Sequence, residues 1–447
     1  MTTLEVLADY IADFTLDDLQ PTVLDRALLS TLDTLAAAAG GFQTTNATAT
    51  RDAAFALFGS GEVPIWFGAG KTMIGGAMLA NCAAASALDV DDGHRAAAGH
   101  PGASIVPAVL TNAFHAEWDG PRMLAAVVLG YEIALRIAAA RRPDPLISFA
   151  SGRWCGYGVA AALGWLHGLN RDELAHALAI VGAESPQSLP QGASRNMGTV
   201  KGSSPWSTLT ALAAVERARS GATGPVDILD LEFAYDPARI SQGLGESWQI
   251  EATYLKPYAS CRYTHPAIDA VLAIASEHRL TLGEIDELIV EIFPEAQKIP
   301  NQRRPDTLEA AQFSIPFCVA IAALLGGDAL RPLRERSLQD EAVLALSQRV
   351  DIVFAEEFAG QFPSRTPARV TIKVRGNTYA KGVEYPMGDV ANPLGRADVE
   401  AKFFALATDV LPRQAVERII DAAEEMRSGS ATRLLRVLAD PSLASSA

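Results

Sequence analysis

The chain has 447 residues, of which 49% are hydrophobic and 20% are charged, and its formal net charge is −15. This composition excludes an intrinsically disordered chain and a small disulfide-stapled scaffold, and the length predicts two or three domains. Because a nucleic-acid partner requires a basic face, none is expected, and an anionic substrate would need a local cluster of cations.

The sequence also argues against secretion and membrane insertion. The first ten residues contain Glu5 and Asp9 but no lysine or arginine, so they do not resemble a signal peptide. The longest uncharged stretches, residues 154–170 and 310–327, contain glycine and polar residues and are interpreted as buried helices. We expect a cytoplasmic protein with no membrane partner. Its cysteines lie far apart, without zinc-like spacing: Cys82, Cys155, Cys261 and Cys318.

The first 250 or so residues predict helices. Leu4, Leu7 and Ile11 recur at helical spacing, and Pro21 is placed as in the first turn of the next helix. Alanine, the strongest helix former, then dominates a series of segments separated by glycine and proline breakers. These segments are residues 79–88, 123–140, 159–166, 174–180 and 208–217.

The pattern changes near residue 254. A helix is predicted over 266–278, strands over 287–293 and 350–354, and a buried helix over 313–325. Gly376-Asn377 predicts a hairpin turn between strands 369–375 and 378–384. The predicted fold class is mainly α. A large helical domain comprises residues 1–253 and 390–447, and a smaller α+β domain comprises residues 254–389.

The first candidate cluster follows one of the alanine-rich helices. It contains three aspartates and two histidines, namely Asp89, Asp91, Asp92, His94 and His100. Carboxylate oxygens and imidazole could bind a metal ion, or a carboxylate could orient a histidine for acid–base work. The alternative is a solvated helix end.

Three further clusters carry cations. Arg195 and Lys201 lie in a glycine- and serine-rich segment before a helix, which suits carboxylate binding or is an ordinary basic loop. Arg153 could bind a carboxylate or belong to a helix-entry loop. Residues 255–266 lie at the domain junction, a favoured place for a ligand pocket, although His265 could instead cap the next helix. They include Lys256, Tyr258, Cys261, Arg262, Tyr263 and His265.

In this order, the clusters resemble the MmgE/PrpD family of 2-methylcitrate dehydratases, cis-aconitate decarboxylases and an iminodisuccinate epimerase. The resemblance covers nearly the whole chain, through Leu88-Asp-x-Asp-Asp, His100-Pro, Lys201, Lys256-Pro-Tyr and Cys261-Arg-x-x-His265-Pro. It implies the fold predicted above, a homodimer and no cofactor. It also implies a site between the domains that is lined by Asp89, His100, Lys201 and His265.

Departures from the family pattern suggest the reaction. Residues 149–155 contain no histidine and offer Arg153, while Ser86 and Ser204 stand where relatives often carry histidine. Dehydration requires a general acid to expel hydroxide, whereas epimerisation requires only removal and return of a proton. We therefore favour an epimerase of an iminodisuccinate-like amino-polycarboxylate. The alternatives are a 2-methylcitrate-type dehydratase or related carboxy-lyase, a metal-dependent hydrolase, and a non-catalytic polyanion-binding protein.

The expected roles follow from this interpretation. Lys201 or His265 would abstract the α-proton, and His100, oriented by Asp89, would be a second proton donor. The expected partner is a small anion with two or more carboxylates, and no metal is assigned. Its predicted binding residues are Arg153, Arg262, Tyr258, Tyr263, Arg195 and Ser204.

Overall fold

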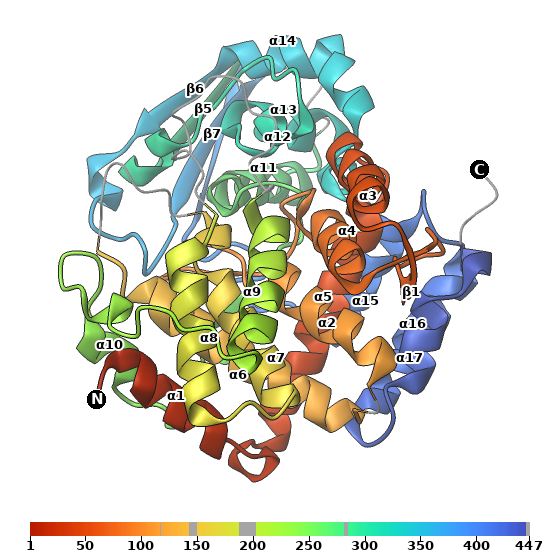
Figure 1. The fold of residues 1–447 in the computed structure, drawn as a ribbon. Helices are drawn as coiled ribbons and strands as arrows, with labels where there is room; N and C mark the ends of the chain where they lie inside the picture. The colour runs from red at the N-terminus through yellow and green to blue at the C-terminus, as the bar shows by residue number, and fades with distance from the viewer. Residues whose placement is uncertain (117, 143–149, 187–202, 281–284, 444–447) are drawn as a thin grey trace.

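The computed structural model describes residues 1–116, 118–142, 150–186, 203–280 and 285–443. Within these ranges the chain is mainly helical, and a small sheet with its own helices lies above the helical part in Figure 1. The fold class is therefore mainly α with an α+β domain, as the sequence predicts. No helix of these ranges is both long and apolar enough to cross a membrane.

The first half of the chain forms a bundle of helices around α6 and α7. Small residues permit this packing, because a Cβ at Gly158 would lie 2.3 Å from the carbonyl oxygen of Gly130. Its helices are α1 (Thr3–Asp13), α2 (Pro21–Gly41), α3 (Thr45–Phe58), α4 (Ile74–Ser86), α5 (Gly102–Asn112), α6 (Gly120–Ala139), α7 (Cys155–Leu166), α8 (Arg171–Glu184), α9 (Ser203–Arg219) and α10 (Pro237–Ser241).

The second half contains a four-stranded sheet of order β6-β5-β7-β8. Strand β5 runs parallel to β6 and antiparallel to β7. Leu288, Val290 and Ile292 of β5 are buried on one face, while Glu291 on the other face pairs with Arg369 at 2.7 Å. The elements are β5 (Glu287–Ile292), β6 (Val350–Phe354), β7 (Ala368–Val374), β8 (Asn377–Val383), α11 (His265–Glu277), α12 (Leu308–Gln312), α13 (Ile315–Leu325) and α14 (Glu341–Arg349).

The hairpin between β7 and β8 turns one residue earlier than the sequence predicts. Its central residues are Arg375 and Gly376, with φ of 50° and 77°, because Val374 pairs with Asn377. A two-residue turn with positive φ at both positions matches the twist of the strands. This register places Val374 on the buried side of the sheet, and burial outweighs the turn preference of Asn377.

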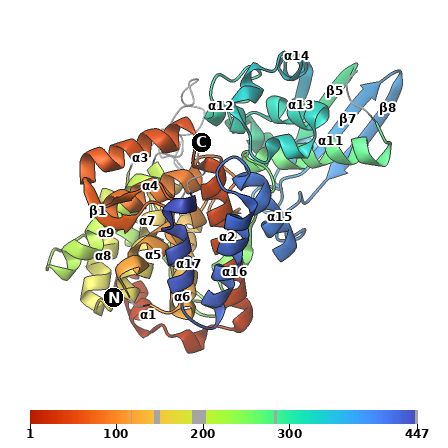
Figure 2. The ribbon, with the colours of Figure 1, turned by 90° about the vertical axis from the view of Figure 1, so that its right-hand side faces the viewer.

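The C-terminal helices return to the first half of the chain. Helix α15 (Arg396–Ala407) packs along α2, and α16 (Arg413–Glu424) and α17 (Thr432–Leu438) follow beside it (Figure 2).

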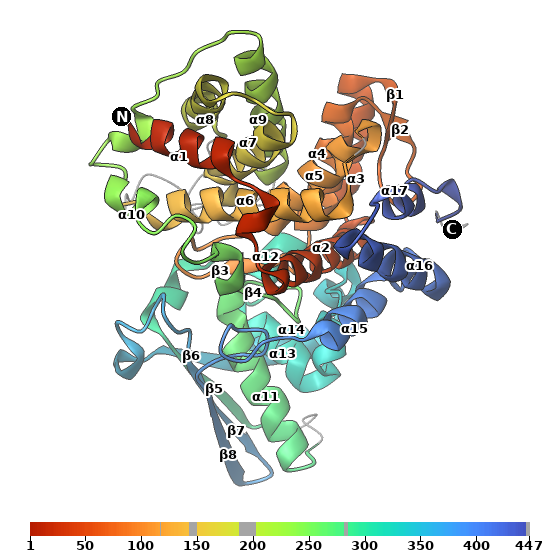
Figure 3. The same ribbon diagram turned by 90° about the horizontal axis from the view of Figure 1, so that it is seen from below.

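Two short contacts bring the first and third clusters together. Strand β3 (Gly93–His94) pairs with β4 (Thr253–Tyr254), which directly precedes the third cluster (Figure 3). Gln312 of α12 donates to the carbonyl oxygen of Ala87 at 3.0 Å. The residues that follow α4 therefore lie where the helical part meets the α+β part. A second ribbon, of β1 (Ser60–Pro64) and β2 (Lys71–Thr72), lies elsewhere on the helical part.

Candidate active site

Asp89 occupies a special backbone position just beyond the end of α4. Its φ is 52°, in the left-handed region that few residues other than glycine adopt and that aspartate tolerates better than most. Its side chain is 1% exposed. The backbone thus turns sharply where the first carboxylate of the cluster is presented.

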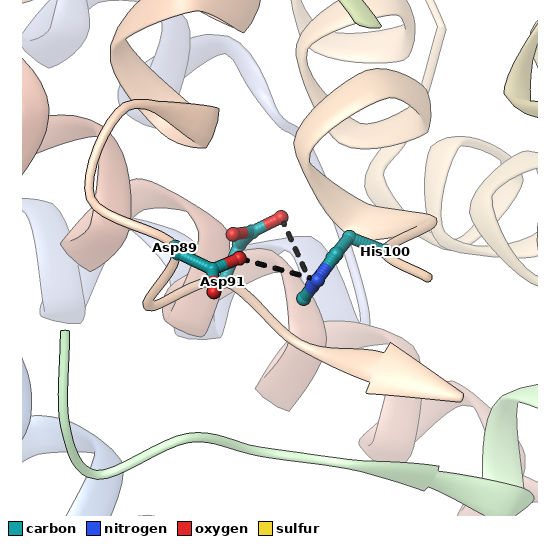
Figure 4. A group of neighbouring side chains, drawn as sticks. All are labelled: Asp89, Asp91 and His100. Carbon is teal, nitrogen blue, oxygen red and sulfur yellow. Dashed lines mark ion pairs between the residues drawn. The ribbon is translucent and has the colours of Figure 1, made fainter. Parts of the chain in front are cut away.

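His100 faces oxygen acceptors with both ring nitrogens. Its Nε2 lies 3.2 Å from Asp89 Oδ1, and its Nδ1 lies 3.7 Å from Asp91 Oδ2 (Figure 4). The same Nδ1 lies 2.6 Å from the carbonyl oxygen of Asp92. Carboxylate and carbonyl oxygens only accept hydrogen bonds, so the imidazolium is the form of His100 that could donate from both nitrogens. Its side chain is 17% exposed, which leaves it open to a reaction partner.

Lys256 joins this pair from the third cluster. Its Nζ lies 3.1 Å from Asp89 Oδ1, and the side chain is fully buried. Buried charges are stable only when they are paired, and here one carboxylate oxygen faces both an ammonium and an imidazole. The sequence analysis placed Lys256 in its cluster but gave it no role. The sequence feature that could have identified Lys256 as a site residue is its place directly before Pro257-Tyr258, in the pattern shared with the family.

Asp92 behaves differently from its neighbours. Its Oδ1 accepts a hydrogen bond from the backbone N–H of Gly102 at 3.0 Å, and its Oδ2 accepts one from the Tyr131 hydroxyl at 2.8 Å. Burial, followed by the nearby charges of Asp33 and Asp91, raises the pKa of Asp92 to about 7. The cluster can therefore lose one of its negative charges near neutral pH.

A metal ion would find suitable ligand atoms here. One atom each from Asp89, Asp91 and His100 lie within 4.8 Å of one another, and oxygen with imidazole suits several divalent metals. Asp91 is fully buried, and within the described part of the chain neither of its carboxylate oxygens has a hydrogen-bond partner. However, Lys256 already supplies a positive charge to Asp89, so one of these three ligands has a counter-charge from the chain itself.

His265, expected as an acid or base, is fully buried. Its Nδ1 accepts from Arg262 Nη1 at 3.2 Å, and its Nε2 donates to the carbonyl oxygen of Ser260 at 3.2 Å. Burial, helped by the charges of Arg262 and Lys256, holds the pKa of His265 well below its usual range. The imidazole is therefore neutral, and both of its nitrogens are engaged.

Arg262 and the two tyrosines, expected to bind substrate, are held by protein groups. Arg262 donates to the carbonyl oxygens of Met387 at 2.9 Å and Pro386 at 3.0 Å. The Tyr258 hydroxyl donates to Asp269 Oδ1 at 2.8 Å. Tyr263 packs edge-on against two phenylalanines of the α+β domain, Phe293 and Phe362. These contacts position the third cluster and engage both terminal nitrogens of Arg262 and the hydroxyl of Tyr258.

The segment around Arg153 lies beside His100. The Ser151 hydroxyl accepts from the backbone N–H of His100 at 2.9 Å, and Arg153 closes the same helical turn. A Cβ at Gly152 would lie 2.5 Å from the carbonyl oxygen of Ser203, so this turn touches the first residue of α9. Ser204, in that first turn, is buried. Arg195 and Lys201 lie outside the described residues.

Comparison with known families places both halves of the chain in one group. The MmgE/PrpD N-terminal domain matches residues 5–240, and the MmgE/PrpD C-terminal domain matches residues 258–427.

Curated relatives are similar over most of their length. Cis-aconitate decarboxylase of Aspergillus terreus (strain NIH 2624 / FGSC A1156) is 25% identical over 97% of this chain and 95% of the relative. Cis-aconitate decarboxylase of Mus musculus is 25% identical over 82% of this chain and 79% of the relative. A cis-aconitate decarboxylase-like protein of Aspergillus oryzae (strain ATCC 42149 / RIB 40) is 24% identical over 77% of each. The chain is a member of the MmgE/PrpD family.

Proposed function

We propose that this chain is a cofactor-independent enzyme that transfers a proton at the carbon α to a carboxylate of a small polycarboxylate. We further propose that it is an epimerase of an iminodisuccinate-like amino-polycarboxylate. The observation that carries the proposal is the partly exposed His100, whose two nitrogens face Asp89 and the Asp92 carbonyl oxygen. A histidine held in this way is a general acid of fixed orientation.

The reaction would proceed in two proton transfers. A base removes the hydrogen on the α-carbon as a proton, and the electron pair of the C–H bond passes into the adjacent carboxyl group as an enediolate. His100 then delivers a proton to the opposite face, which restores the C–H bond with inverted configuration. After one turnover Lys201 is protonated and His100 is neutral, which is the state that catalyses the reverse reaction. Proton exchange with water restores the starting forms. Lys201, in its neutral form, is the proposed base, and it precedes the start of α9 by two positions.

The substrate carboxylates would be bound at the turn that holds Arg153. This turn lies against His100 on one side and against the start of α9 on the other. A guanidinium and a helix N-terminus both favour a carboxylate, and the same groups stabilise the charge of an enediolate. A local cationic site of this kind is required by a chain whose net charge is −15.

The absence of histidine from residues 149–155 and from position 204 supports epimerisation over dehydration. Residues 149–155 contain no histidine, and Ser204 follows the proposed base by three positions. His265 is neutral and engaged at both nitrogens. Expulsion of hydroxide needs a further positioned acid, whereas epimerisation needs one group on each face of the α-carbon.

A carboxy-lyase is the second candidate, and the relatives favour it. Three of them are named as cis-aconitate decarboxylases or as similar to one. In a decarboxylation the C–C bond to a carboxylate breaks, carbon dioxide leaves, and its bonding electron pair remains on carbon. His100 in its charged form could protonate that carbon, with one proton consumed in each turnover.

Proton exchange followed by NMR distinguishes these reactions. The purified protein is incubated in D₂O, without added metal, with iminodisuccinate, 2-methylcitrate or cis-aconitate in separate samples. Deuterium incorporation at the α-carbon of iminodisuccinate, with interconversion of its stereoisomers, is the expected result. His100→Asn and Lys201→Met should each abolish the interconversion, because each removes the proton-transfer group on one face of the α-carbon. Formation of an alkene from 2-methylcitrate, or loss of carbon dioxide from cis-aconitate, would replace the epimerase with a lyase. If both variants retained near wild-type interconversion of the stereoisomers, the roles of His100 and Lys201 would be wrong.

A further inference from the structure

The backbone between Asp89 and Asp91 is held from a distant part of the chain. Lys402, in the C-terminal helix α15, donates to the carbonyl oxygen of Val90 at 2.7 Å. The same ammonium lies 2.5 Å from Asp33 Oδ1 on α2. Lys402 is 4% exposed, and Asp33 and Val90 are fully buried. Helices α15 and α2 pack side by side in this region (Figure 2).

We propose that Lys402 is a positioning residue for the candidate active site, acting through the Val90 carbonyl on the carboxylates at either side of it. The kinetic part of this inference rests on the proposed function, whereas the structural part does not. The carbonyl of Val90 belongs to the peptide plane between Val90 and Asp91. A hydrogen bond to it fixes that plane, which contains the Cα of Asp91 and is linked to Asp89 through the backbone of Val90 alone.

The conformation of Asp89 explains why such a contact is needed. Its φ of 52° is unfavourable for a residue with a side chain, and a conformation of this kind persists only where surrounding contacts enforce it. The backbone N–H of Asp89 bonds to the carbonyl oxygen of Ser86 at 3.4 Å, which holds the preceding side of the residue. Lys402 holds the peptide group that follows Val90, one residue further along the chain. The two contacts together direct Asp89 Oδ1 toward His100 and Lys256.

Asp33 gives Lys402 its own fixed place. A lysine has four rotatable side-chain bonds, so a buried ion pair is needed to direct its ammonium to one carbonyl oxygen. Without Lys402, the Asp33 carboxylate would lie buried near Asp91 and Asp92 with its main counter-charge removed. A variant that removes only the lysine would therefore mix loss of positioning with loss of stability.

The test uses four variants of the full-length chain. Lys402→Met removes the donor, and Lys402→Met with Asp33→Asn removes the donor and the partner charge together. Lys402→Arg retains a charged donor. Arg396→Met is the matched control, because Arg396 lies on the same helix and forms ion pairs with Glu400 and Glu424 that do not reach the site. Thermal unfolding identifies the variants that fold.

The first readout requires no substrate. In protein with ¹⁵N-labelled histidine, the side-chain signals of His100 are assigned by their absence in His100→Asn. We expect the double variant to shift these signals and Arg396→Met to leave them in place, with a smaller shift in Lys402→Arg. A folded double variant with unchanged His100 signals would overturn the proposal. Should Lys402→Met fail to fold, the double variant still provides the test.

The second readout is turnover of whichever substrate the D₂O experiment identifies. Misplaced catalytic groups cost activity steeply, so kcat should fall about 10- to 100-fold in the double variant with little change in KM. In an Asp89→Asn background the same replacements should have a much smaller effect, since both act through one carboxylate. If the effects of the Lys402 and Asp89 replacements on kcat were fully additive, Lys402 would not act through the Asp89 carboxylate. Shifted His100 signals without turnover of any substrate would support the positioning role and contradict the proposed function.

Discussion

Lys256 and Asp89 form a fully buried ion pair in which Nζ lies 3.1 Å from Oδ1. The two residues lie 167 positions apart in the sequence, and the same oxygen also faces His100 Nε2 at 3.2 Å. One carboxylate oxygen therefore connects the partly exposed histidine to the boundary with the α+β domain. The negative charge of Asp89 therefore acts on both the ammonium of Lys256 and the imidazole of His100.

Replacement of Asp89 by asparagine should reduce kcat by about 10²- to 10⁴-fold, the usual range for loss of acid–base assistance. The amide cannot stabilise the imidazolium of His100, and it leaves Lys256 without its counter-charge. Steady-state kinetics with the identified substrate measures the effect. Asp52→Asn, at an exposed position on α3, is the control and should behave as wild type. Near wild-type kcat in Asp89→Asn would remove Asp89 from the mechanism.

His265→Gln should lower the melting temperature but leave the shape of the pH–rate profile unchanged. The imidazole holds Arg262 and the Ser260 carbonyl oxygen, and its lowered pKa keeps it neutral across the working range. The decisive measurement is kcat/KM against pH. Loss of one limb of the profile in His265→Gln would show instead that this histidine is the acid or base that the sequence suggested.

Arg153→Met should raise KM about 10- to 100-fold, the equivalent of one charge-assisted hydrogen bond, with a smaller effect on kcat. Arg153→Lys should recover only part of the loss, because an ammonium cannot bind a carboxylate through two parallel bonds. Arg219→Met, at the far end of α9, is the matched control and should leave KM unchanged. An unchanged KM in Arg153→Met would place carboxylate binding elsewhere.

Asp92→Asn should flatten the pH dependence of stability. The pKa of Asp92 is raised to about 7 from 3.8, so between these values the folded protein holds a proton that the unfolded chain has released. This carboxyl therefore makes folding less favourable as the pH rises from 4 to 7, by roughly 1.4 kcal/mol per unit of pKa difference.

The measurement is urea unfolding of both proteins at several pH values. The amide of the variant can mimic the protonated carboxyl beside Tyr131 and Gly102, so the fold should be retained. The stability of Asp92→Asn relative to wild type should rise across this window and then level off above pH 7. A difference independent of pH would mean that Asp92 is ionised throughout.

Treatment with a chelator should leave activity unchanged, because Lys256 already neutralises Asp89 and no metal is needed to hold His100. Activity before and after dialysis against EDTA is compared, with metal content measured in parallel. Loss of activity that a divalent cation restores would favour the metal-dependent alternative, in which Asp89, Asp91 and His100 are the ligands.

The sequence alone predicted the elements whose patterns are local. Strand β6 begins and ends where the alternation of residues 350–354 indicates, and α11 starts one residue before the predicted helix. Side-chain periodicity and helix-capping residues act within a few positions, so one sequence suffices to find them. Order along the chain and residue type were also enough to identify the clusters that resemble the family.

Tertiary structure alone decided which members of those clusters meet and what each one does. Lys256 reaches Asp89, and Lys402 reaches Val90, across separations that no periodicity encodes. The neutral state of His265 and the raised pKa of Asp92 likewise depend on burial and on charges brought together by folding. Charge states and counter-charges are properties of a three-dimensional environment, whereas residue types and their spacing are fixed by the chain itself.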